Sequence, residues 1–474
     1  MRRGPDTPAV DPPVDGASRG VSVPELSTDA DVGSDWAAGL DIQARLARWA
    51  PAACVIAAVF AVIAVVSVVL VLRNPPENRF ADLHVYWGTV KFWRSGRSPY
   101  QWAAPNGDPF TYPPFALVLF WPLAAIPEGV VQAFWMAATL LLIPALSAGL
   151  SARWPRPEAV FAPSTPWRAR ALAMLTRGRL TWVIACCLLL SSPLQSDLRF
   201  GQISLVVVSL TLADALGLVR GRARGCLIGL AAAIKLTPAV FIVWLLAVGR
   251  RREGLRALVT FGLAAAIGAV VLPTASRDYW TTYLFNADRI GDLAQPSNQS
   301  VRGMLLRLHI TGGVLSVLWL GLAAAVVAVA LRRAVRLTRA GRVTHAVVLV
   351  GCSTIAASPV SWTHHQVWTV VAGVLLLIER RQAQVLAGFL VLFVMIVSVG
   401  HAAGAVPIGG FLQGLAVDLR GLAAIGVVLV GFAAHSPWDL RGRGAAGPGV
   451  RWAGDGPESR RAGNGVAPVV LSDE

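Results

Sequence analysis

The sequence predicts an all-α membrane protein that crosses the bilayer many times. Of its 474 residues, 55% are hydrophobic and only 14% are charged, and the mean hydropathy is +0.59. The apolar residues fall in long runs, and a run inside a membrane satisfies its backbone polar groups only as a helix. The formal net charge of +16 comes mostly from arginines in short segments between these runs. This pattern is typical of cytoplasmic loops, so we expect membrane lipids as partners and no nucleic acid.

The two ends of the chain differ in composition from its middle. Residues 1–48 are rich in Pro, Asp, Ser and Gly, and residues 437–474 are rich in Gly and Arg. Neither range shows an apolar helical period, so both are predicted to be disordered cytoplasmic tails. The first apolar run begins near Pro51 and is too long for a cleaved signal peptide. We therefore expect residues 49–436 to form one transmembrane domain.

Twelve apolar segments between the tails are candidate membrane helices. They cover residues 51–72, 113–126, 129–150, 180–193, 203–219, 225–248, 256–273, 312–331, 343–358, 366–379, 382–400 and 411–434. If all of them crossed, the arginine-rich loops would lie on both sides of the membrane, against the positive-inside rule. Segment 113–126 is short and Pro-rich, and segment 225–248 is broken between Lys235 and Pro238, so we expect both to be short or broken hairpins. About 10–12 transmembrane helices are thus predicted, with both termini in the cytoplasm.

With this topology the polar and aromatic clusters all lie on the outer side of the membrane. They occupy two external loops, 73–112 and 274–311, and the outer ends of segments near Gln202 and His364. Because arginine counting alone set the topology, this segregation independently favours one site on the outer face.

Asp82 is the candidate catalytic base. It lies in the stretch 81–87, just outside the first membrane segment and among aromatic residues that suit the headgroup level. An acidic residue on a solvated loop is the simpler interpretation of this stretch alone. Asp197 and Asp288 are alternative bases.

The short motifs together resemble the actinobacterial mannosyltransferases of glycosyltransferase family 87. The strings that carry the resemblance are residues 82–86, 110–114, 200–202, 233–238, 279–280, 288–291, 298–304 and 358–365. They occur in order and cover roughly residues 50 to 435. Because many separate strings agree, the resemblance is specific.

The resemblance implies a GT-C fold and a membrane mannosyltransferase. Such an enzyme would use polyprenyl-phosphate-mannose as donor and a glycolipid or lipoglycan acceptor, such as a phosphatidylinositol mannoside. It would form an α-1,2 linkage with inversion on the outer face of the plasma membrane, with Asp82 as the base. One alternative is a related enzyme that transfers another sugar, such as arabinofuranose. The other is a lipid-sugar transporter or flippase, which predicts two repeated halves that the sequence does not contain.

A lipid phosphate as leaving group needs positive charge or strong hydrogen-bond donors. Lys235 is one of only two lysines in the chain and lies in an apolar segment, where an unpaired charge is unfavourable. His364 and His365, together with Arg289 and Arg302 on the second external loop, are further candidates. Alternatives are a lysine that reaches water or pairs with a carboxylate, structural histidines, and arginines at the membrane surface.

The same clusters supply candidates for sugar binding. They are Tyr86, Tyr112, Gln202, Asp288, Asn298 and Gln299. Aromatic belts of any membrane protein are the alternative explanation for the tyrosines. No cofactor or metal is predicted, because the five cysteines lack metal-type spacing and adjacent histidines cannot face one ion.

Overall fold

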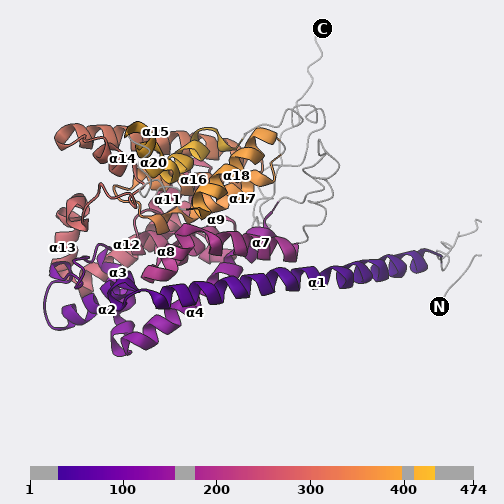
Figure 1. Ribbon diagram of the computed structural model, residues 1–474, viewed down its shortest axis with the longest axis horizontal. Helices are drawn as coiled ribbons and strands as arrows, with labels where there is room; N and C mark the ends of the chain where they lie inside the picture. The colour runs from indigo at the N-terminus through magenta and orange to yellow at the C-terminus, as the bar shows by residue number, and fades with distance from the viewer. Residues whose placement is uncertain (1–29, 155–176, 380, 398–409, 433–474) are drawn as a thin grey trace, which may run out of the picture. The chain divides into compact units, whose positions relative to one another are not determined.

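Helices are the only regular secondary structure in the described part of the protein. In the computed structural model it comprises residues 30–154, 177–379, 381–397 and 410–432 (Figure 1). These residues form no β-strand, only an isolated bridge between Ala103 and Pro109. The all-α prediction for a polytopic membrane protein is therefore confirmed.

Helix α1, Ala30–Arg73, begins earlier than the sequence predicts. Its part up to Ala52 belongs to a unit of its own, and the rest of α1 lies in a second unit with the other described helices. The start at Ala30 falls within the range 1–48 expected to be a tail. Ala, Leu and Arg are frequent after residue 36, and these residues favour helix even without an apolar period. Residues 1–29 and 433–474, which include the whole predicted tail 437–474, lie outside the described residues.

Five described helices are long and apolar enough to cross a membrane. They are the part of α1 from Ala52, α4 (Glu128–Ala152), α12 (Arg251–Val271), α15 (Gly312–Arg339), and α20 (Gly410–Gly426) continued by the π-helix η8 (Val427–Gly431). In the most apolar 18-residue stretch of each of these helices, only 17% to 28% is buried inside the protein. Their apolar faces can therefore contact lipid.

There are six shorter helices in the described residues. They are α7 (Arg177–Leu190), α8 (Ser192–Phe200), α9 (Ser204–Ala215), α16 (Val343–Ala357), α17 (Val367–Leu377) and α18 (Gln382–Ile396). All but α8 occupy other predicted segments, and α8 lies mainly between the predicted segments 180–193 and 203–219. Helices α7 and α8 meet at an angle of 67° and together can count as a sixth span. The described residues thus contain five or six long spans, and the predicted total of about 10–12 crossings stays a prediction.

Both segments predicted to be short or broken are so in the structure. Residues 113–126 form α3 (Pro114–Phe120) and a 3-10 turn, η3 (Trp121–Ala125). Residues 225–248 are divided into α10 (Cys226–Ile234) and α11 (Ala239–Ala247). The break follows from Pro238, because the residue before a proline avoids the helical region and the proline lacks an N–H.

The two predicted external loops contain short helices of their own. The first holds η1 (Pro76–Asn78), α2 (Ala81–Arg94) and η2 (Pro99–Gln101). The second holds α13 (Pro273–Thr281), η5 (Tyr283–Phe285), η6 (Ala287–Ile290) and α14 (Val301–Arg307). Two more 3-10 turns are η4 (Gly221–Ala223) and η7 (Thr363–Gln366).

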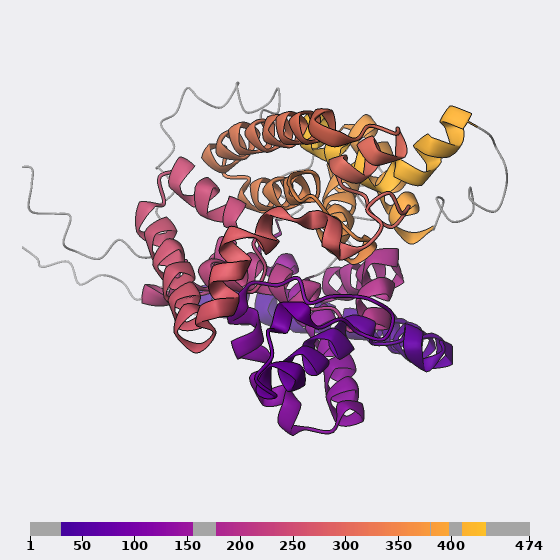
Figure 2. The same ribbon diagram turned by 90° about the vertical axis from the view of Figure 1, so that its left-hand side faces the viewer.

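Within the second unit, neighbouring helices pack in pairs. Helix α15 lies against α16, α17 against α18, α4 against α7, and α10 against α12. Figure 2 shows the helices of residues 81–152 on one side and those from α15 onward on the other. Turn η7 packs on α8, and α8 in turn contacts α2. These contacts bring the start of α2, the end of α8 and turn η7 together.

Candidate active site

A cavity of about 380 Å³ lies where these helix ends meet. It is bounded by the start of α2, the loop before α3, the end of α8, the break between α10 and α11, the segment 279–297 and the loop before α17. Its polar lining residues include Asp82, Asp108, Tyr112, Ser196, Gln202, Lys235, Thr237, Tyr279, Tyr283, Gln295, Ser297, Ser358, Thr363, His364 and His365. Side chains predicted from separate stretches of sequence thus share one cavity.

Asp82 lies in the first turn of α2, held by contacts on either side. Phe80 precedes the helix in a left-handed conformation, and its N–H donates to the carbonyl of Arg199 at 2.7 Å. Leu83 is fully buried, and His84 Nδ1 lies 2.7 Å from Glu128 Oε1. These contacts fix the helix that carries Asp82, so its carboxyl faces the cavity from a rigid position.

The environment of Asp82 suits a general base. The pKa of its carboxyl is raised to about 7, mainly by burial and to a smaller extent by the nearby Asp108 carboxyl. A hydrogen bond with Gln202 and the positive charge of Lys235 act in the opposite direction. A carboxylate with a pKa near neutrality is partly ionised at pH 7 and still accepts a proton readily.

Gln202 organises the floor of the cavity. Its Oε1 accepts hydrogen bonds from Tyr86 at 3.1 Å and Tyr112 at 3.0 Å, and the two phenol oxygens lie 2.8 Å apart. Because Oε1 is occupied, the amide NH₂ is the group left to donate to Asp82. Tyr112 and Gln202 line the cavity, whereas Tyr86 is fully buried behind them.

Lys235 is the C-cap residue of α10, and its extended backbone begins the break between α10 and α11. Its Nζ lies 2.7 Å from His365 Nε2, donates to Ser204 Oγ at 3.3 Å, and lies 5.4 Å from the Tyr112 ring centre. Ser204 Oγ is also 3.4 Å from Gln202 Oε1. A continuous set of contacts therefore connects Lys235 with the group that binds Asp82.

The two histidines of η7 are neutral donors or acceptors. Burial and the positive charge of Lys235 hold the pKa of both His364 and His365 well below its ordinary value. His365 Nδ1 accepts the N–H of Trp362 at 3.1 Å. His364 Nδ1 lies 3.4 Å from Ser196 Oγ, and its buried Nε2 has no hydrogen-bond partner among the described residues. His364 lines the cavity, so its imidazole can contact a ligand there.

Three predicted site residues of the second external loop do not line the cavity. Arg289 donates to the carbonyls of Phe110 at 3.0 Å and Tyr100 at 2.9 Å, which joins the two external segments. Arg302 pairs with Asp288 at 2.7 Å, and Asp288 is 78% exposed. These contacts account for the three charges without a ligand.

The predicted amides Asn298 and Gln299 hold loops together instead of facing the cavity. Asn298 donates to the Leu293 carbonyl and accepts the N–H of Ser361, both at 2.9 Å. Gln299 donates to the Val417 carbonyl and accepts the N–H of Gly421, both at 2.8 Å. Both side chains are almost completely buried, so neither is open to a substrate.

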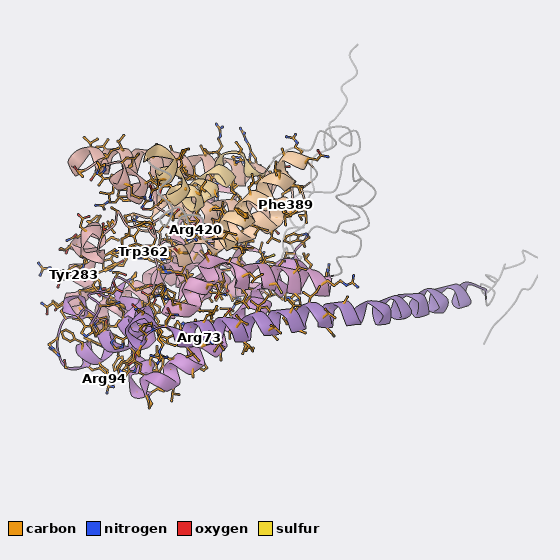
Figure 3. All side chains as sticks on the ribbon, viewed as in Figure 1. Arg73, Arg94, Tyr283, Trp362, Phe389 and Arg420 are labelled. Atoms are coloured by element: carbon orange, nitrogen blue, oxygen red, sulfur yellow. The ribbon has the colours of Figure 1, made fainter. Side chains whose placement is uncertain are left out.

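Several cavity residues were not predicted from sequence. They include Asp108, Tyr279 and Tyr283. Figure 3 labels two residues that line the cavity, Tyr283 and Trp362. The chain has only five tyrosines. Tyr112, Tyr279 and Tyr283 line the cavity, Tyr86 bonds to Tyr112, and Tyr100 stacks on Tyr279. The rarity of tyrosine was the signal that could have found them.

Comparison with known proteins identifies a family. The model of Glycosyltransferase family 87 matches residues 110–359, more than half of the chain. The match includes Tyr112, Gln202 and Lys235 but not Asp82 or the histidines of η7. The roles of Asp82 and the histidines therefore depend on the geometry. No solved structure matches the chain.

Curated relatives come from mycobacteria. A polyprenol-phosphate-mannose-dependent alpha-(1-2)-phosphatidylinositol mannoside mannosyltransferase of Mycobacterium tuberculosis is 34% identical over 297 residues, which are 60% of this chain and 67% of the relative. The protein of the same name from Mycolicibacterium smegmatis is 33% identical over 303 residues, again 60% and 67% of the two chains. A corresponding pentamannoside mannosyltransferase of M. tuberculosis is 32% identical over 334 residues, 68% and 73% of the two chains.

The family match spans the cavity floor and the Lys235 break, and the helical architecture is that expected of a polytopic GT-C enzyme. The chain therefore belongs to glycosyltransferase family 87 and is a membrane glycosyltransferase.

Proposed function

We propose that the chain transfers mannose from polyprenyl-phosphate-mannose to a phosphatidylinositol mannoside or related lipoglycan. The names of the relatives support this donor and acceptor, and an α-1,2 linkage. The observation that carries the proposal is the single cavity that Asp82 shares with Lys235 and His365. A base and a phosphate-binding group in one cavity are the two parts that this reaction needs.

In the proposed step, a hydroxyl of the acceptor attacks the anomeric carbon of the β-linked mannose. The new carbon–oxygen bond forms as the bond to the phosphate oxygen breaks, and its electron pair leaves with polyprenyl phosphate. Asp82 takes the proton of the attacking hydroxyl. Because attack occurs opposite the leaving group, the product is the α-mannoside.

The leaving phosphate would lie at the Lys235 end of the cavity. Lys235 supplies positive charge, and His364 and His365 supply neutral imidazoles beside it. The contacts from Lys235 through Ser204 and Gln202 to Asp82 hold the two ends at a fixed separation. Fixed groups of this kind stabilise charge that develops in the transition state without having to reorganise.

We place this reaction on the outer face of the plasma membrane, with both termini in the cytoplasm. The arginine-rich segments between the apolar runs support this orientation by the positive-inside rule.

The test is transfer of radiolabelled mannose in membranes that contain the chain, with phosphatidylinositol mannosides as acceptors. We expect a longer product whose label an α-1,2-specific mannosidase releases. Polyprenyl-phosphate-arabinofuranose is the competing donor and should give no product. Transfer of arabinose, or label that the mannosidase does not release, would contradict the proposed donor or linkage respectively.

A further inference from the structure

The two ends of the cavity differ in chemistry. One end holds Lys235 and the two histidines of η7. The other end is the part lined by Tyr279 and Tyr283, which both contact Tyr100, and among the described lining residues Lys235 is the only Lys or Arg. Asp82 lies in the same cavity, and both Lys235 and Asp108 act electrostatically on its carboxyl. An anion is favoured at the first end, and a neutral polar ligand at the second.

The tyrosines form a fixed aromatic wall at the second end. Tyr100 stacks on Tyr279 with ring centres 5.6 Å apart and an angle of 25°, and its ring lies 4.9 Å from that of Tyr283. The Arg289 guanidinium carbon lies 4.5 Å from the Tyr283 ring centre while its nitrogens bond to backbone carbonyls. Arg289 thus covers part of the Tyr283 ring and restrains it, whereas the ring still lines the cavity.

A sugar ring matches this end better than a phosphate does. Its apolar C–H face can pack on an aromatic ring, and its hydroxyls can bond to the carboxylate of Asp108, the amide of Gln295 and the hydroxyl of Ser297. Asp108 Oδ2 already accepts from Asn106 at 2.8 Å, which fixes the carboxyl group. A phosphate at this end would face Asp108, and the positive charge beside Tyr283, that of Arg289, already donates to the carbonyls of Phe110 and Tyr100.

The direction of attack indicates whether the sugar at this end belongs to the donor or to the acceptor. If the donor phosphate lies at Lys235, the attacking hydroxyl must approach from the opposite side of the anomeric carbon and must reach Asp82. The acceptor then extends from Asp82 away from Lys235. Of the tyrosines that line the cavity, Tyr112 lies beside Lys235. Tyr279 and Tyr283 contact Tyr100 instead, and they are the ones we assign to the acceptor. We propose that Tyr283 and its neighbours bind a neutral hexose ring at the end of the acceptor, an inference that rests on the proposed function. The acceptor's own lipid phosphate stays outside this end of the cavity.

The test uses octyl α-mannoside, a neutral acceptor without phosphate, and the variant Tyr283→Ala. Loss of the ring should raise the KM for octyl mannoside about tenfold, the effect expected of one aromatic contact, while the KM for the donor stays the same. Equilibrium binding of octyl mannoside without donor should weaken by a similar factor. Tyr283→Phe, which keeps the ring, should recover most of the loss.

Phe285→Ala is the matched control, because Phe285 is 77% exposed and does not line the cavity. It should leave both KM values unchanged. If Tyr283→Ala does not fold, Tyr283→Leu replaces it, because leucine fills most of the volume of the ring without an aromatic face. Tyr283→Leu should likewise raise the KM for octyl mannoside and leave the KM for the donor unchanged.

An unchanged acceptor KM in Tyr283→Ala or Tyr283→Leu, or a raised donor KM instead, would overturn the inference while mannose transfer by the wild type still upholds the proposed function. No mannose transfer by the wild type to any acceptor would contradict the proposed function. In that case, binding of octyl mannoside that Tyr283→Ala weakens would still uphold the subsite, and binding that it leaves unchanged would overturn it.

Discussion

Asp82 makes the reaction dependent on pH. Its pKa is raised from 3.8 to about 7, so the carboxyl is protonated and inactive as a base below that pH. We expect kcat/KM to rise with pH and to level off above about 7, falling about tenfold per unit at lower pH. Initial rates over a pH series at low donor concentration measure this profile. A flat profile from roughly pH 5 to 8 would exclude a base with this pKa.

Lys235 should matter for donor binding more than for acceptor binding. Lys235→Gln removes the charge beside His365, and we expect the donor kcat/KM to fall by about 10²–10³, as for loss of one group that stabilises an anionic leaving group. The matched control is Lys91→Gln, which changes the only other lysine in the sequence. Lys91 lies over the Trp87 ring at 3.6 Å and does not line the cavity. Equal losses in the two variants would contradict the role of Lys235.

Residue type and local motif predicted only part of the cavity. Asp82 and Lys235 stand out in the sequence because a charge at a membrane boundary or inside an apolar run needs a partner. Arg289 carries the same charge but is held by the carbonyls of Phe110 and Tyr100, which are distant in sequence. The sequence gives the charge of a side chain but not its partner. The sequence alone therefore could not distinguish the structural role of Arg289 from the proposed phosphate-binding role of Lys235.

At the level of elements, α8 must approach α2 closely for Asp82 to face the cavity. Gly201 ends α8 with φ of +65°, and a Cβ there would lie 2.7 Å from Leu83 Cβ. We expect Gly201→Ala to push α2 away, and so to lower both mannose transfer and the melting temperature in detergent.

Gly221 provides the control for this substitution. It has the same φ of +65°, but a Cβ there would meet nothing within 4 Å. Gly221→Ala should therefore carry only the backbone strain, about 1 kcal/mol, and leave transfer intact. If the two variants behave alike, the contact between α8 and α2 does not position Asp82.

Helix boundaries followed from the sequence more closely than loop structure did. The break at Lys235–Pro238 was predictable because proline excludes a continuous helix. Helices α2, α13 and α14 were expected to be loops, since their mixed polar composition gives no long apolar run. They become helical by packing on other elements, as α2 does through the fully buried Leu83 and Tyr86, and this depends on tertiary contacts.

At the level of the whole molecule, the cavity must open on the outer face if mannose is transferred there. Leu236 lines the cavity, and Ala223 lies in the exposed turn η4, which is expected to be cytoplasmic. In a chain whose native cysteines are replaced, a membrane-impermeant reagent should label Leu236→Cys in intact cells, and donor should protect it. Ala223→Cys should react only after the membrane is opened. The reverse pattern would place the site on the cytoplasmic side.

The central claim is that Asp82 is the base of a cavity whose other end binds the donor phosphate. The most direct test is mannose transfer by Asp82→Asn with donor binding measured in parallel. The control is Asp292→Asn, an equal change at an exposed residue that does not line the cavity. The account predicts that Asp82→Asn lowers transfer about 10²–10⁴-fold, as for loss of a general base, with donor binding retained and the control unaffected. Transfer by Asp82→Asn at the rate of the control would contradict it.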